Sequence, residues 1–144
     1  MRINGEWSVC EDGVVRPIVN GRVQTVMGEW VSADFLLDIG ADCSVLNGDL
    51  LSQLGLPLLK SEEGLSGLGG GAASVVVETK LLLTRADGGT VVFSHRWAAV
   101  TDAGSLDLCI LGRDITDLFA VIIDRPQDLV CLLNQRHRYT IVQD

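Results

Sequence analysis

The stretch Phe35-Leu36-Leu37-Asp38-Ile39-Gly40-Ala41-Asp42-Cys43-Ser44-Val45-Leu46 decides how the rest of this sequence is interpreted. A short apolar run ends at a carboxylate, Asp38, which stands between Leu37 and Ile39. A carboxylate in apolar surroundings needs hydrogen bonds or a charged partner, because desolvation penalises its ionised form. Such groups are frequent at functional sites. Asp38 is therefore the first candidate for chemistry.

The composition indicates a folded, acidic protein. The chain has 144 residues, of which 47% are hydrophobic, and its formal net charge is -8. This length fits a single domain over residues 1–144 with a sizeable core. A strongly acidic chain is poorly suited to phosphate contacts, so we expect no nucleic-acid partner.

The ends and the cysteines favour a cytoplasmic protein. No apolar segment follows Arg2, so no signal peptide is predicted, and no apolar run approaches the ~20 residues of a membrane span. We therefore expect no membrane partner. Cys10, Cys43, Cys109 and Cys131 lie far apart without a Cys-x-x-Cys pair, which predicts reduced thiols, and we expect neither a metal nor another cofactor.

Apolar and β-branched patterns predict a chain built mostly of strands, preceded by an irregular N-terminal arm over residues 1–12. The dipeptide Asn20-Gly21 predicts a hairpin turn, and Asp87-Gly88-Gly89 predicts another. The predicted strand regions are residues 14–26, 30–37, 74–84, 90–100, 106–111, 121–124, 129–133 and 136–142.

Two short helices and one glycine-rich segment complete the predicted elements. Residues 47–55 have helical spacing, with Asn47 or Asp49 as the N-cap and Gly55 at the end. A second short helix is expected around residues 115–119. The glycine-rich segment 60–73 has few side chains to pack, so we expect either a movable lid or a surface loop without a role. A phosphate-binding loop is disfavoured, because no Gly-Lys-Ser/Thr follows.

Three features follow one another in an order that resembles a known family. They are the motif Asp38-Ile39-Gly40-Ala41-Asp42, the glycine-rich segment and the motif Ile110-Leu111-Gly112-Arg113-Asp114. Over roughly residues 14–130 the chain resembles the retroviral-type aspartic proteases, the retropepsins, in their single-domain form. The resemblance implies an all-β fold, a small closed β-barrel of the acid-protease type with one or two short helices.

The resemblance also implies an activity. Retropepsins are aspartic endopeptidases that hydrolyse peptide bonds by general acid–base catalysis, using two carboxylates that share one proton and a water as nucleophile. This chain has one Asp-x-Gly-Ala, and neither Asp114 nor Asp124 stands in such a context. Asp38 is then expected to meet Asp38 of a second copy in a homodimer that takes a peptide or protein substrate.

Further roles come from matching the family's motifs position by position. Asp38 is the catalytic residue, and Arg113 is expected to support the site through an ion pair with Asp42. The expected substrate-binding residues are Gly40, Ala41, Asp42, the flap-tip residues Gly67, Leu68 and Gly69, and the cleft-wall residue Ile110.

Ile39 departs from the family pattern, which has Thr or Ser at this position to form hydrogen bonds across the dimer axis. Isoleucine keeps the β-branched shape but cannot form those bonds. One alternative is therefore a weakened or inactive retropepsin-like module for dimerisation or peptide binding. A second is an unrelated small hydrolase or binding barrel, in which Asp38 is a satisfied turn carboxylate. Cys43, beside the site, is interpreted as a small buried hydrophobe or as a redox-sensitive thiol.

Overall fold

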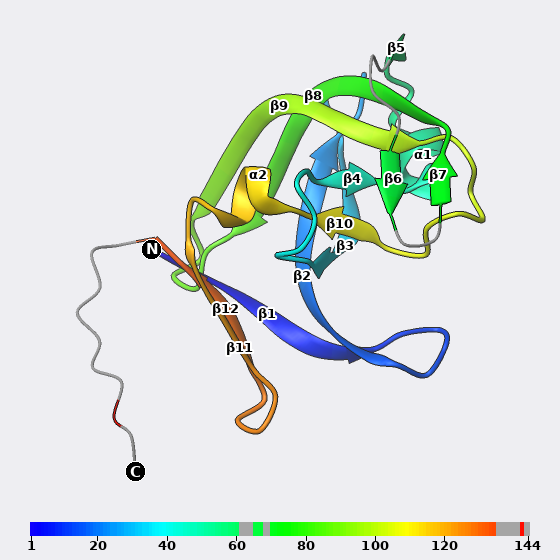
Figure 1. Cartoon of the computed structure of the whole chain (residues 1–144). Coiled ribbons are helices and arrows are strands. Elements are labelled where there is room, and N and C mark those ends of the chain that lie inside the picture. The colour runs from blue at the N-terminus through cyan, green and yellow to red at the C-terminus, as the bar shows by residue number, and fades with distance from the viewer. Residues whose placement is uncertain (61–64, 68–69, 135–141, 143–144) are drawn as a thin grey trace.

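The computed structural model describes residues 1–60, 65–67, 70–134 and 142. Its elements are predominantly strands (Figure 1). They are β1 (Arg2–Val9), β2 (Val15–Gln24), β3 (Trp30–Leu37), β4 (Val45–Leu46), α1 (Gly48–Leu54), β5 (Leu59–Lys60), β6 (Leu65–Gly67), β7 (Gly70–Ala72), β8 (Ser74–Thr84), β9 (Thr90–Val100), β10 (Cys109–Leu111), α2 (Arg113–Thr116), β11 (Ala120–Asp124) and β12 (Leu129–Leu133).

Six of the described strands close into a barrel. The strands pair in the order β2-β3-β10-β4-β9-β8, and the pairing of β2 with β8 closes the ring. The pairs β3–β10 and β4–β9 are parallel, whereas β2–β3, β2–β8 and β8–β9 are antiparallel. The predicted all-β barrel with one or two short helices is therefore confirmed, and the described residues contain two, α1 and α2.

The barrel interior is apolar because its strands alternate inward and outward side chains. Phe35 and Leu37 of β3 are buried, and the neighbouring Asp34 is exposed. Trp97 of β9 is a large side chain in the core, and its indole Nε1 donates a hydrogen bond to the Thr79 carbonyl oxygen at 3.0 Å. The bond satisfies the polar atom of this buried ring.

The expected turn at Asn20-Gly21 is wrong, because β2 continues through it from Val15 to Gln24. A Cβ at Gly21 would lie 2.9 Å from Leu81 Cδ1 and 3.1 Å from Phe35 Cε2. Glycine is therefore suited to this position by close packing rather than by a turn. The turn between β2 and β3 lies at Thr25–Glu29, where Gly28 has a φ of 84°.

The expectation of an irregular N-terminal arm is also wrong, because Arg2–Val9 form β1. The first half of β1 pairs with β12 and its second half pairs with β2, both antiparallel. These two strand pairings give the backbone N–H and C=O groups of β1 hydrogen-bond partners within the protein, whereas those of an isolated arm would bond to water. Figure 1 shows β11 and β12 beside the start of β1 and diverging from it, while the second half of β1 continues toward β2.

Several local predictions agree with the structure. Strands β8 and β9 have the predicted bounds, and Gly88 in the turn between them has a φ of 84°. Helix α1 begins at the N-cap Asn47, whose side chain accepts a hydrogen bond from the Leu50 amide, and it ends at Gly55 with a φ of 62°. The strand predicted for residues 136–142 falls almost entirely outside the described residues.

Candidate active site

Strand β3 carries Asp38 to the end of the barrel. The parallel pairing of β3 with β10 runs to Leu37 opposite Leu111, and both side chains are buried. One residue further on, the Asp38 amide donates to the Leu111 carbonyl oxygen at 3.2 Å. The strand ends there, and the Asp38 side chain is half-buried. The carboxylate is thus fixed to rigid strand structure and remains accessible.

A tight turn follows, and the carboxylate of Asp38 closes it. The Gly40 amide donates to Asp38 Oδ1 at 2.9 Å, and the Ala41 amide donates to the Asp38 carbonyl oxygen at 3.2 Å. A Cβ at Gly40 would lie 3.2 Å from Asp38 Oδ1. A side chain at residue 40 would therefore crowd the carboxylate that the turn orients.

Ile39 projects from this turn into solvent. Its exposed fraction is 59%, although the residues on either side of the loop, Leu37 and Ser44, are buried. A single exposed isoleucine is common on protein surfaces. This one lies directly beside Asp38, so the edge of the site is apolar in the isolated chain.

The second half of the loop contacts helix α2. The Arg113 amide donates to the Ala41 carbonyl oxygen at 2.8 Å, and the Arg113 guanidinium forms an ion pair with Asp42. The side chains of both charged partners are largely exposed. The contact links the loop to the motif that follows β10, as the resemblance implies.

A second contact between the same segments was not predicted from the sequence. The Ser44 amide and hydroxyl both donate to Asp114 Oδ1, at 2.9 and 2.7 Å. The Gly112 amide in turn donates to Ser44 Oγ at 3.0 Å. Ser44 directly precedes the apolar pair Val45-Leu46, which indicates a buried position. A buried hydroxyl needs a hydrogen-bond partner, and this requirement was the one sequence signal for the contact.

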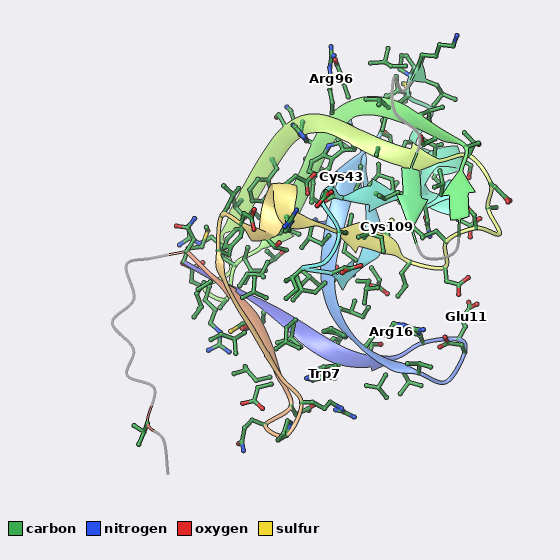
Figure 2. The ribbon with its side chains drawn as sticks, viewed as in Figure 1. Trp7, Glu11, Arg16, Cys43, Arg96 and Cys109 are labelled. Atoms are coloured by element: carbon green, nitrogen blue, oxygen red, sulfur yellow. The ribbon has the colours of Figure 1, made fainter. Side chains whose placement is uncertain are left out.

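The Cys43 thiol lies on this loop and is labelled in Figure 2. It is half-buried. Burial, together with the charges of Asp114 and Asp42, raises the pKa of Cys43 above its ordinary value. The thiol is therefore held in its protonated, less reactive form near neutral pH.

Of the remaining expected site residues, some lie among the described residues and some do not. Ile110 is half-buried in β10, between β3 and β4. Gly67 pairs with Gly70 in the hairpin of β6 and β7, and the expected tip residues Leu68 and Gly69 lie outside the described residues. A cavity of about 370 Å³ lies elsewhere, lined in part by Asp34, Asp49 and Asp107 and by none of residues 38–44.

The described residues contain no group of three or more His, Cys, Asp or Glu side chains that could hold a metal ion. Neither α1 nor α2, the helices found in the described part of the chain, is long and apolar enough to cross a membrane.

Comparison with known proteins gives a family and a fold. A family model described as aspartyl protease matches residues 19–115. A retropepsin-like aspartic protease from Rickettsia conorii is 22% identical, with a TM-score of 0.56, and the match covers 92% of this chain and 88% of that one.

Two further structures were matched with lower TM-scores. EIAV protease complexed with the inhibitor HBY-793 is 24% identical, with a TM-score of 0.49 over 71% of this chain and 86% of that one. The retroviral protease-like domain of Ddi1 from Leishmania major is 16% identical, with a TM-score of 0.48 over 85% and 98%. A search of curated proteins found no match.

Proposed function

This chain belongs to the aspartyl protease family, and we propose that it is an endopeptidase that acts as a homodimer with Asp38 of each protomer in one catalytic pair. The observation that carries the proposal is the position of Asp38. Asp38 directly follows strand β3, and its backbone amide donates a hydrogen bond to the Leu111 carbonyl oxygen. Its carboxylate accepts a hydrogen bond from the Gly40 amide, which orients it. It also belongs to the one Asp-x-Gly-Ala sequence in the chain.

The chemistry follows from bringing two such carboxylates together. Two like charges a few ångströms apart cannot both ionise cheaply, so the pair holds one proton between them, an arrangement for which aspartic proteases are the established example. In the first step the ionised partner takes a proton from a water molecule, whose oxygen attacks the scissile carbonyl carbon. The protonated partner gives its proton to the carbonyl oxygen, so that a tetrahedral diol forms. In the second step the carboxyl that took the water's proton passes it to the amide nitrogen, and the C–N bond breaks to release the amine. A diol hydroxyl returns a proton to the other carboxylate as the carboxylic acid product forms. Both steps use protein carboxylates and water alone, so the proposed mechanism needs no cofactor.

The proposed substrate is an extended segment of a peptide or protein. Gly40, Ala41 and Asp42 would contact its backbone, and Ile110 would form part of the cleft wall. Gly67 belongs to the hairpin of β6 and β7, which we propose as the flap, with Leu68 and Gly69 at its tip. We further propose that residues 1–144 form a single domain and that the protein is cytoplasmic, since its four cysteines are free.

The test is cleavage of a mixed peptide library at acidic and neutral pH by the native chain and by Asp38→Asn. The asparagine keeps the shape of the turn but cannot exchange a proton, so we expect cleavage to fall at least ~1,000-fold, the combined effect of losing the acid and the base. Asp117→Asn, on an exposed residue of the same type, is the matched control and should retain full activity. Equal cleavage by native and Asp38→Asn proteins would refute the assignment.

Ile39 supports a second candidate, an inactive module of the same fold that dimerises or binds peptides. The exposed isoleucine cannot form the hydrogen bonds that a hydroxyl would supply beside Asp38. This candidate predicts peptide binding by the native chain without cleavage, and equal binding by Asp38→Asn. Cleavage that depends on Asp38 would exclude it.

A further inference from the structure

We call residues 38–44 the catalytic loop. We infer that Asp114 and Ser44 are positioning residues that fix its second half, residues 41–44, and thereby set the orientation of Asp38. The inference rests on the proposed function. It concerns two side chains that touch neither the reacting bond nor the water molecule.

Ser44 and Asp114 form a closed chain of hydrogen bonds with Gly112. Ser44 Oγ accepts from the Gly112 amide at 3.0 Å and donates to Asp114 Oδ1 at 2.7 Å. The Ser44 amide donates to the same carboxylate oxygen at 2.9 Å. The Ser44 hydroxyl is thus used both as donor and as acceptor, which no apolar replacement of similar size can reproduce.

The surroundings leave little room for another arrangement. Ser44 has an exposed fraction of 1%. A Cβ at Gly112 would lie 2.4 Å from the carbonyl carbon and oxygen of Cys43, so the backbones of the two segments are in direct contact. Buried polar groups that lose a partner incur the full desolvation penalty, because water cannot replace it. The Ser44–Asp114 contact is therefore expected to be rigid.

The loop has a second, weaker anchor in the ion pair of Asp42 with Arg113. Both side chains are more than half exposed, and exposed pairs of this kind contribute little. The contact of the buried Ser44 with the half-buried Asp114 must then supply most of the side-chain fixation of residues 41–44. Because these residues follow the turn that Asp38 closes, a shift at Ser44 is transmitted to the carboxylate.

Asp114 acts here through its hydrogen bonds rather than through its charge. Both bonds from Ser44 end on the single oxygen Oδ1. An asparagine presents an equivalent oxygen at the same place, so Asp114→Asn should keep the arrangement. Asp114→Ala and Ser44→Ala should break it.

The experiment compares kcat and KM of the dimeric native protein with those of four variants and one control. We expect Asp114→Ala and Ser44→Ala each to lower kcat by about 10- to 100-fold, with KM changed less than about threefold. The double variant should be no worse than the poorer single variant, because both remove one contact. Asp114→Asn should remain within about threefold of the native protein. The matched control is Asp117→Ala, at the exposed end of α2, which should behave as the native chain.

Normal kcat in Asp114→Ala, or additive losses in the double variant, would overturn the inference. Loss of activity in Asp114→Asn as severe as in Asp114→Ala would likewise overturn it. Circular dichroism and the unfolding midpoint identify a variant that fails to fold. If Asp114→Ala fails to fold, the comparison of Ser44→Ala with Asp114→Asn remains the test.

An independent measurement uses the Cys43 thiol in a Cys10→Ser background. Asp114 is one of the charges that raise the pKa of Cys43. Asp114→Asn removes that charge, so the midpoint of alkylation against pH should move to lower pH. An unchanged midpoint would contradict the placement of Asp114 beside Cys43. If the native chain cleaves no peptide, the proposed function fails, and this measurement still tests the placement of Asp114.

Discussion

At the scale of single residues, the exposed Ile39 is central to the proposed dimer. Its side chain is 59% exposed and lies one residue from Asp38. Covering a fully exposed isoleucine is worth about 1.5–3 kcal/mol, and Ile39, which is partly covered already, would gain correspondingly less from each copy. In the proposed dimer, apolar packing of the two Ile39 side chains would hold the two loops together, but it lacks the directionality of hydrogen bonds between hydroxyls.

We predict that Ile39→Thr raises kcat. Threonine keeps the β-branched shape and adds a donor and an acceptor at the place where the two loops would meet. One to two new hydrogen bonds at about 0.5–1.5 kcal/mol each correspond to an increase of about two- to tenfold after the loss of apolar contact. The measurement is initial cleavage rate at saturating substrate, and Ile39→Val is the control, since it alters size without adding a hydroxyl. A lower rate in Ile39→Thr would show that apolar packing of Ile39 is required.

The catalytic loop also shows how far single residues can be predicted from sequence. Asp38 and the pairing of Asp42 with Arg113 could be anticipated, because they lie within recognisable motifs. The contact of Ser44 with Asp114 was not anticipated, although Asp114 stands in one of those motifs and Ser44 lies just beyond the other, because several hydroxyl and carboxylate side chains there could pair and the sequence does not specify which of them do. Only the ladder of β3 with β10 brings them together.

At the scale of elements, β2 shows where local signals fail. Asn-Gly is a strong hairpin signal, but its strength comes from backbone conformations with positive φ. Gly21 instead faces Leu81, Leu83 and Phe35, where a missing side chain matters more than a permissive backbone. Helix α1 and the pair β8–β9 were predictable, because their caps and turn are purely local. Tertiary packing determines that β2 continues through Gly21, and pairing with a strand near the other end of the chain determines that residues 2–9 form β1.

We predict that Gly21→Ala destabilises the fold by about 1–3 kcal/mol, the usual cost of overpacking a core. The added methyl group would have to displace Leu81, which is itself buried. Urea unfolding should show a lower midpoint with an unchanged slope. Gly104→Ala is the control, because its nearest neighbour, Asp102 Oδ1, is 3.6 Å from the added Cβ. Equal midpoints for both variants would mean that β2 adjusts freely at Gly21.

At the scale of the whole molecule, the barrel closes on itself but the sheet that extends from it does not. Among the described residues, β11 is the last strand of the order β11-β12-β1-β2 and has a neighbour on one side only. Leu118, just before it, and Ile123, within it, are 53% and 39% exposed. Unpaired strand edges with apolar side chains favour association with another chain.

We predict that the protein sediments with twice the 15.5 kDa of one chain at micromolar concentration. Each protomer carries a formal charge of -8, so the two copies repel each other. Added salt screens this repulsion, and the dissociation constant should therefore fall as ionic strength rises. Cleavage rate should follow the dimer fraction across the same dilution series. A monomer that cleaves peptides at full rate would contradict the proposed pairing of Asp38.

The contact between Ser44 and Asp114 also has a consequence for how the protein is made. The catalytic loop leaves the ribosome 70 residues ahead of Asp114, which at ~5–20 residues per second is roughly 4–14 seconds. During that interval the loop lacks Gly112, Arg113 and Asp114, the residues that hold its second half. A nascent chain therefore carries Asp38 without an ordered site, so the proposed protease would not be expected to cleave before synthesis of the barrel is nearly finished.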